Sequence, residues 1–264
     1  MEPVPTLLND TKELNMGKDK KQRFEGVDVF KFKCYPGVSC FSNCCQDITI
    51  VLTPYDVLRL KKGLDISSGE FLDKHTIIIP EKGHLIPLVI LKMNESDKKC
   101  PFVSEDGCSV YGDRPWPCRM YPLNINDDGT YSLIADSSKC LGLEEKESNK
   151  ISELLEKQGV GPYDEMNEYL SSLIVQLQSQ NMDINNPQIQ QMIVMALYNI
   201  DKFREFVFKS TFLDRFDVDA VTLEKIKRSD VELLKFSFDW IKFGLFGQKL
   251  FWVKEKPNNI GSSG

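Results

Sequence analysis

The chain has 264 residues, of which 41% are hydrophobic and 27% charged, a profile typical of a soluble protein with one large domain or a domain plus an appended helical bundle. A total of 33 lysines and arginines against 39 aspartates and glutamates gives a formal net charge of −6. This balance disfavours broad electrostatic attraction to nucleic acid or to an anionic membrane, so we expect neither as a partner.

The N-terminus lacks the cationic start and unbroken apolar stretch of a secretory signal, and residues 10–21 are polar. The most apolar short segment, residues 85–91, is far below the roughly 18 residues that suggest a membrane span, and it contains a proline. We therefore expect a cytoplasmic protein. Because the cytosol is reducing, cysteines there favour metal binding or chemistry over structural disulfides.

The first 63 residues predict an N-terminal arm, one short strand and one short helix. Residues 1–28 are polar and lack periodicity, which predicts a flexible N-terminal arm. Residues 47–52 have the composition of a strand. Residues 53–56 supply an N-cap, a proline at the first helical position and an acid at the third, which predicts a helix to about Lys62, with Gly63 ending it.

A second set of local signals follows. Residues 67–70 offer another capping box, which predicts a short helix over Phe71 and Leu72. Residues 76–79 and 85–92 have strand composition, and residues 81–84 form the expected hairpin turn between them.

A hairpin and then helices complete the chain. An Asp-Gly turn at residues 126–129 links predicted strands at 121–125 and 131–135. Helical apolar spacing follows at residues 151–155, 166–177, 189–200, 223–227 and 231–246. We predict an α+β fold: a flexible arm (1–28), a small turn-rich cysteine-cluster domain with short strands and helices (29–142), a mostly helical C-terminal domain (143–256) and a flexible tail (257–264).

All eight cysteines precede the helical half: Cys34, Cys40, Cys44, Cys45, Cys100, Cys108, Cys118 and Cys140. Cysteines that serve only as small core residues would occur in both halves, whereas thiolate ligands must converge within about 2.3 Å of a metal. Turn residues next to Cys34, Cys100 and Cys108 would allow such convergence. We expect a cysteine-bound metal site in the first half, with buried inert thiols as the plainer alternative.

The surroundings of Cys118 are the most restricted. Three prolines in the segment 114–122 limit the backbone on both sides of this thiol. Arg114 and Arg119 flank it, and we expect them to pair with nearby acids such as Asp113 or Glu105. The aromatic residues of this segment, Trp116 and Tyr121, are expected to form a hydrophobic lid over the metal site.

These motifs carry a family resemblance. The ordered string of Cys34 through Cys45, Cys100-Pro101-Phe102, Gly107-Cys108, and Arg114-Pro115 to Cys118-Arg119-Met120-Tyr121-Pro122 resembles the YkgJ-type cysteine-cluster family over about residues 30–142. That family is described as chelating zinc or iron. The resemblance implies that the seven cysteines from Cys34 to Cys118 are metal ligands, and that Cys140 corresponds to a later Cys-Pro-Gly element, here with Leu141 in place of proline.

The number of sites and the metal stay open. Adjacent Cys44 and Cys45 would face opposite ways in extended backbone, so one of them is expected to serve a second site or to stay free. Eight thiols fit two four-thiolate sites or one site with spare cysteines. The two histidines, His75 and His84, fall in expected strand or turn positions away from the cysteines, so we expect neither to bind metal.

Two functions compete. A redox-active or catalytic centre requires an iron-sulfur cluster or iron, which more than four candidate thiols favour. The cysteine-rich pattern is also similar to that of flagellin lysine-N-methylases, which implies catalysis in protein modification. The alternative is a structural zinc-binding module whose helical half recognises a protein partner. A protein partner or protein substrate is expected in both cases.

Overall fold

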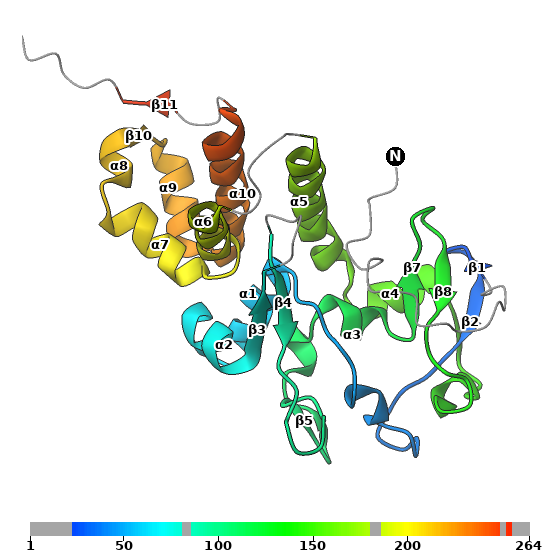
Figure 1. Cartoon of the computed structure of the whole chain (residues 1–264). Coiled ribbons are helices and arrows are strands. Elements are labelled where there is room, and N and C mark those ends of the chain that lie inside the picture. The colour runs from blue at the N-terminus through cyan, green and yellow to red at the C-terminus, as the bar shows by residue number, and fades with distance from the viewer. Residues whose placement is uncertain (1–22, 81–85, 180–185, 249–251, 255–264) are drawn as a thin grey trace, which may run out of the picture.

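The computed structural model describes residues 23–80, 86–179, 186–248 and 252–254, and it has the predicted α+β architecture. In Figure 1 the short strands β1, β2, β7 and β8 lie at one end of the molecule, and the helices α6 to α10 lie at the other. Helices α1, α3, α4 and α5 lie between them, and α2 lies below α6 and α7 in this view. The predicted tail (257–264) lies outside the described residues, as do residues 1–22 of the predicted arm.

Small antiparallel sheets join distant parts of the first half. Strands β1 (Arg23–Phe24), β8 (Tyr131–Leu133) and β7 (Leu123–Ile125) form a three-stranded sheet in the order β1-β8-β7. The predicted Asp-Gly turn is confirmed, because the Asn126 N–H donates to Thr130 O at 2.8 Å and Gly129 adopts a φ of +78°. Both hairpin strands are shorter than predicted.

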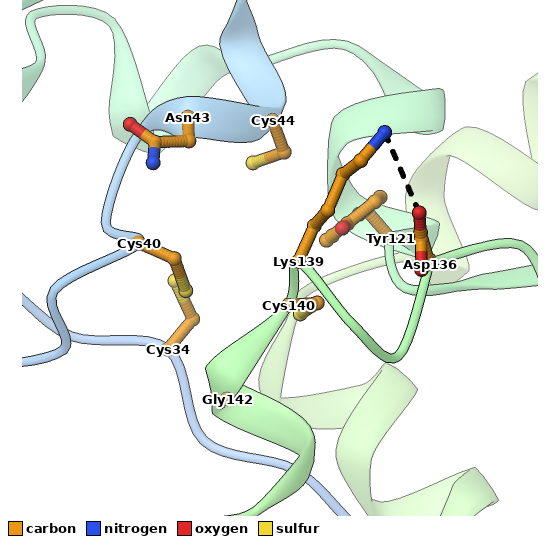
Figure 2. A pocket seen from close by; sticks show the side chains of 9 residues that line it. All are labelled: Cys34, Cys40, Asn43, Cys44, Tyr121, Asp136, Lys139, Cys140 and Gly142. Carbon is orange, nitrogen blue, oxygen red and sulfur yellow. Dashed lines mark ion pairs between the residues drawn. The ribbon is translucent and has the colours of Figure 1, made fainter.

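A second pair, β2 (Val29–Lys31) with β9 (Ser148–Lys150), positions the cysteines. Directly after β2, the Lys33 N–H donates to the carbonyl of Gly142 at 3.0 Å. This pairing places the start of the cysteine region against its end, which Figure 2 shows as Cys34 facing the segment of Cys140 and Gly142.

The strand predicted at residues 47–52 is wrong. The segment makes only an isolated bridge from Val51 to Ile90, with a second bridge from the neighbouring Gln46 to Lys99. A 3-10 turn, η1 (Asn43–Cys45), precedes it, and Asp47 adopts a positive φ of 53°. These bends interrupt the regular pairing that a continuous strand requires.

Both capped helices are confirmed. Helix α1 (Pro54–Gly63) has the full predicted capping box between Thr53 and Asp56. Helix α2 (Ser68–His75) is capped by the Ser67 side chain, which accepts from the Glu70 N–H at 3.1 Å.

The predicted strands at 76–79 and 85–92 are present as β3 (Thr76–Ile79) and a shorter β4 (Leu88–Leu91), which pair antiparallel. Strand β4 begins after Pro87, whose ring nitrogen has no N–H to donate to a partner strand. The turn predicted at 81–84 lies outside the described residues.

Five short elements complete the first half, and two of them, β6 and α3, contain Cys108 and Cys118. They are β5 (Val103–Ser104), β6 (Gly107–Cys108), η2 (Tyr111–Asp113), α3 (Trp116–Met120) and η3 (Leu141–Leu143).

The helical half comprises α4 (Ile151–Lys157), α5 (Gly161–Gln178), α6 (Pro187–Leu197), α7 (Ile200–Lys209), α8 (Phe212–Arg215), α9 (Ala220–Arg228) and α10 (Asp230–Phe246), with β10 (Phe216–Asp217) paired to β11 (Trp252–Val253). The apolar pattern at 189–200, predicted as one helix, crosses the boundary between α6 and α7. The Asn199 side chain accepts from the Lys202 N–H at 3.3 Å and starts α7 as a new helix.

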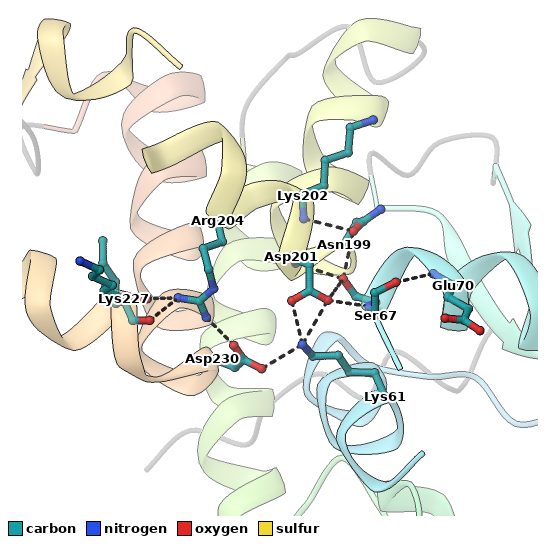
Figure 3. A network of polar contacts seen from close by, with 11 residues as sticks. Lys61, Ser67, Glu70, Asn199, Asp201, Lys202, Arg204, Lys227 and Asp230 are labelled. Atoms are coloured by element: carbon teal, nitrogen blue, oxygen red, sulfur yellow. Dashed lines mark hydrogen bonds and ion pairs between the residues drawn. The ribbon is translucent and has the colours of Figure 1, made fainter. Parts of the chain in front are cut away.

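One hydrophobic core runs through both halves, because α1 packs on α5 and α10. A polar network reinforces this contact (Figure 3). The Lys61 ammonium, on a side chain only 10% exposed, pairs with Asp201 at 2.9 Å and Asp230 at 3.0 Å. Asp201 also accepts from the Ser68 N–H at 2.6 Å. None of the helices in the described ranges is long and apolar enough to cross a membrane.

Candidate metal centre

The eight cysteines are all free thiols, and they gather in two neighbouring sets. The first, here called the outer set, is Cys34, Cys40, Cys44 and Cys140, which line one pocket of about 370 Å³. Asn43, Tyr121, Asp136, Lys139 and Gly142 complete its wall. In Figure 2 the Cys34 and Cys40 side chains point toward one another across from Cys140. Residues over a hundred positions apart therefore supply one sulfur-rich cavity.

Backbone contacts hold the outer set together. The Leu141 N–H donates to the Cys40 sulfur at 3.2 Å. Gly142 is required beside it, because a Cβ at this position would lie 2.7 Å from the Lys33 carbonyl oxygen. An N–H directed at sulfur stabilises the thiolate form, and hydrogen bonds of this kind tune metal-bound cysteines.

Burial opposes ionisation of the Cys34 and Cys140 thiols in the absence of a cation. It raises the pKa of Cys34 to about 11, with further contributions from Cys44, Cys40 and Cys140. Burial also raises the pKa of Cys140, against the effect of a hydrogen bond with Tyr121. A bound metal cation reverses this balance, because coordination deprotonates a thiol outright.

The second set, here called the inner set, is Cys45, Cys100, Cys108 and Cys118, and all four belong to or pack against the hydrophobic core. The Cys100 N–H donates to the Cys45 carbonyl at 2.8 Å. The β5–β6 pairing places Cys108 opposite Val103, close to Cys100 in the chain. Cys118 lies within α3, where burial and then repulsion from Cys100 raise its pKa to about 12.

Cys44 and Cys45 divide between the two sets. The extended backbone expected for them is wrong, because both lie in η1. A 3-10 turn has three residues per turn, so consecutive side chains point about 120° apart. Their thiols still touch, and a hydrogen bond from Cys45 lowers the pKa of Cys44 and raises that of Cys45.

The donor atoms of both sets are cysteine sulfurs, which fit a thiophilic metal. Thiolate ligands select zinc, iron-sulfur clusters and related metals. Within the described residues, no group of three or more His, Cys, Asp or Glu side chains is already placed to hold a metal ion. That the eight cysteines bind metal stays a prediction.

His75, the histidine that the structure describes, packs against aromatic rings and is not among the residues that line the outer pocket. His75 ends α2, where its ring packs 5.5 Å from Phe71 and 5.1 Å from Phe102, and burial lowers its pKa. It lies in a helix, not in the strand or turn expected. His84 lies outside the described residues.

The arginine pairing predicted around Cys118 is wrong. Arg119 donates to three carbonyl oxygens, those of Arg114, Gln158 and Gly112, at 2.6 to 2.9 Å. Arg114 donates to the Tyr111 carbonyl at 2.6 Å and to the Gln158 side chain. Asp113, the expected partner, instead pairs with Arg59 at 2.6 Å, a contact between distant segments that the sequence does not signal.

The two aromatic residues expected to form a lid have different roles. Tyr121 lines the outer pocket. Trp116 is buried, and it joins α3 to α1 and α5 through its N–H to Asp56 and its indole N–H to Asp164, both at 2.7 Å. The pocket also holds an ion pair that the cysteine pattern does not signal. The Lys139 ammonium lies 3.4 Å from an Asp136 carboxylate oxygen, one and four positions before Cys140 in the chain.

Comparison with known proteins agrees with the sulfur-rich geometry. Residues 33–151 match the CxxCxxCC family model, described as a "Putative zinc- or iron-chelating domain". No curated protein and no solved structure matches the chain. The match confirms the resemblance to the YkgJ-type cysteine-cluster family and reaches slightly beyond its expected end. The chain is therefore similar to the CxxCxxCC family over residues 33–151.

Proposed function

We propose that the outer set holds an iron-sulfur cluster or iron, and that this centre is the working site of the protein. The observation that carries the proposal is the convergence of Cys34, Cys40, Cys44 and Cys140 on one pocket. Structural zinc sites are closed by four protein ligands, whereas catalytic sites keep room for another molecule. The pocket provides that room.

The volume of the outer pocket, about 370 Å³, favours a cluster over a single ion. Four sulfurs around a single zinc ion lie about 3.8 Å from one another, given zinc-sulfur distances of about 2.3 Å. An iron-sulfur cluster contains several irons and sulfides between its cysteine ligands, so it accepts a wider spacing and fills more of the cavity.

Two polar side chains at the outer pocket, those of Tyr121 and Lys139, are compatible with a redox or catalytic function. The Tyr121 hydroxyl, whose pKa is raised by burial and then by its hydrogen bond with Cys140, can hold a proton next to a ligand sulfur. Lys139, with a side chain 83% exposed, offers a positive charge at the pocket wall. A bound cluster would supply electron transfer, and these groups would orient a partner molecule at its edge.

The test is anaerobic purification followed by iron, zinc and acid-labile sulfide analysis with an absorption spectrum. We expect iron with sulfide and a broad visible band, and we expect Cys34→Ser and Cys140→Ser to lose them. Ser42→Ala, which keeps all eight thiols, is the control. Zinc without sulfide would refute the iron proposal and favour a structural zinc module with a protein-recognising helical half. Absence of both metals would refute metal binding altogether.

A further inference from the structure

We infer that the outer edge of β3 is a docking site for an extended peptide segment of a partner protein, with alternating apolar side chains and an acidic C-terminal end. The peptide would add a strand antiparallel to β3. The strands at this site, β3 and β4, contain no cysteine, so the inference goes beyond the proposed metal function and does not depend on it.

The pair of strands β3 and β4 (Figure 1) packs on the core with one face only, the face of Val89 and Leu91, which are 0% and 2% exposed. The opposite face, here called the outer face, consists of two cross-strand pairs, Ile77 with Ile90 and Ile79 with Leu88. The isoleucines that β3 contributes are 50% and 42% exposed, and their partners on β4 are half-buried. Four neighbouring apolar side chains are therefore open to a partner.

Hydrogen bonds on the far side of β4 show which backbone groups of β3 point outward. The Leu91 N–H donates to the Ile50 carbonyl at 2.9 Å, and the Val89 carbonyl accepts from the Leu52 N–H at 2.7 Å. Residues opposite one another in an antiparallel pair alternate between bonded and non-bonded positions. Because Val89 bonds away from β3, Ile78 opposite it directs its own N–H and C=O away from β4. No backbone hydrogen bond within the described ranges takes up these two groups.

The edge therefore has the chemistry that recognises a strand. Ile78 presents one donor and one acceptor, and its side chain is 39% exposed between two more exposed isoleucines. In strand addition, main-chain hydrogen bonds give affinity and alternate side chains give specificity. Apolar residues at every second position of the added strand would pack against Ile77 and Ile79 and extend the outer face.

A cation at one end of the outer face determines the charge of the partner. The Lys92 N–H donates to the His75 carbonyl at 2.8 Å, so the ladder continues past β4 and Lys92 follows Ile90 on the outer face. Lys92 is exposed, and among the ion pairs of the described residues Lys74 pairs with Glu70 whereas Lys92 has no carboxylate. An added strand lies two spacings of about 4.8 Å from β4, which lysine and glutamate side chains span together. An antiparallel peptide ends on this side, so acidic residues at its C-terminal end complement Lys92.

The small size of the surface favours a peptide over a second copy of the chain. Strand β3 has four residues, and Pro80 after it has no N–H to donate. A stable dimer buries about 800 Å² on each copy, contributed by about 20 to 30 residues. The edge and the outer face supply only a few apolar side chains, enough for a short strand.

The test is fluorescence anisotropy of a labelled hexapeptide of alternating valine and threonine with two glutamates added at its C-terminal end, titrated with the full chain. We expect saturable binding below about 1 mM chain. The same peptide with two lysines in place of the glutamates should bind roughly fivefold more weakly. Lys92→Gln should remove this difference.

Two changes test the hydrogen bonds of the edge. Ile78→Pro should abolish binding, because it removes the outward N–H but no bond between β3 and β4. Val221→Thr, which alters an exposed apolar side chain of α9, should bind as the wild type does. With valines on the outer face, the threonine nitrogens of the peptide face β3. Methylating the threonine nitrogens should therefore abolish binding to the wild-type chain, whereas methylating the valine nitrogens should not.

The methylated peptides decide the question even where Ile78→Pro does not fold. Equal binding of the two methylated peptides, or no saturable binding up to about 1 mM chain, would overturn the inference. Sedimentation of the wild-type chain as a dimer that Ile78→Pro converts to a monomer would assign the edge to a second copy, and would overturn it as well.

Discussion

The Asp56 carboxylate is a buried junction between α1 and the helix that carries Cys118. It is fully buried, one oxygen accepts from the Thr53 N–H at 2.8 Å and hydroxyl at 2.9 Å, and the other accepts from the Trp116 N–H at 2.7 Å. Asp56→Ala removes half of a capping box, which costs about 1 kcal/mol. It also leaves the Trp116 N–H buried without a partner, which costs about 2 kcal/mol more.

We therefore expect Asp56→Ala to lower the free energy of unfolding by about 3 kcal/mol. Thr53→Ala is the matched control, because it weakens the cap but keeps the bond from Trp116 to Asp56, so we expect a loss of about 1 kcal/mol. Urea unfolding of both variants and of the wild-type chain, each with and without chelator, measures these differences. If both variants lose the same free energy of unfolding, the hydrogen bond from Trp116 to Asp56 does not stabilise the contact between α1 and α3.

The pH dependence of the folding stability tests the same Asp56 carboxyl group a second time. Burial raises the pKa of Asp56 from 3.8 in the unfolded chain to about 6. An acid whose folded pKa is raised binds more protons when folded, so its stabilising contribution is complete below pH 4 and lost as pH rises through 6. Relative to Asp56→Asn, the wild-type chain should lose about 3 kcal/mol of stability over this range, measured by urea unfolding.

Three further predictions concern other parts of the molecule. Lys61→Met should lower the free energy of unfolding, measured in urea, by about 3 kcal/mol. The substitution leaves the partly buried carboxylates of Asp201 and Asp230 without the ammonium that they share. Gly142→Ala should weaken metal binding at the outer set in a chelator competition assay, because its Cβ meets the Lys33 carbonyl, whereas Gly112→Ala, with open space around it, should bind as the wild type does. Arg119→Lys should cost about 2 kcal/mol in urea unfolding, because an ammonium cannot reach three diverging carbonyls.

Local chemistry explains which elements were predictable. The caps at Thr53 and Ser67 and the turn at Gly129 depend on residues within four positions of one another, and all three are present as expected. The boundary at Asn199 was missed because its apolar pattern continues across the break between α6 and α7. The strand at 47–52 was wrongly predicted because composition does not reveal the bends, at η1 and Asp47, that limit its pairing with β4 to one bridge.

The sequence by itself determined the class of the candidate site. Eight cysteines confined to the first half, with turns and prolines around them, indicated a thiolate metal centre and the family whose model residues 33–151 match. Ligand chemistry is a property of side chains, so it can be inferred before the fold is known.

Only the tertiary structure decided how these cysteines are grouped. The pairing of β2 with β9 brings Cys34 to Cys140, and a turn at Cys44 and Cys45 directs two adjacent thiols to different sets. The partners of Arg114 and Asp56 likewise come from other segments of the chain. These contacts join residues tens of positions apart, and their geometry depends on packing that no local pattern records.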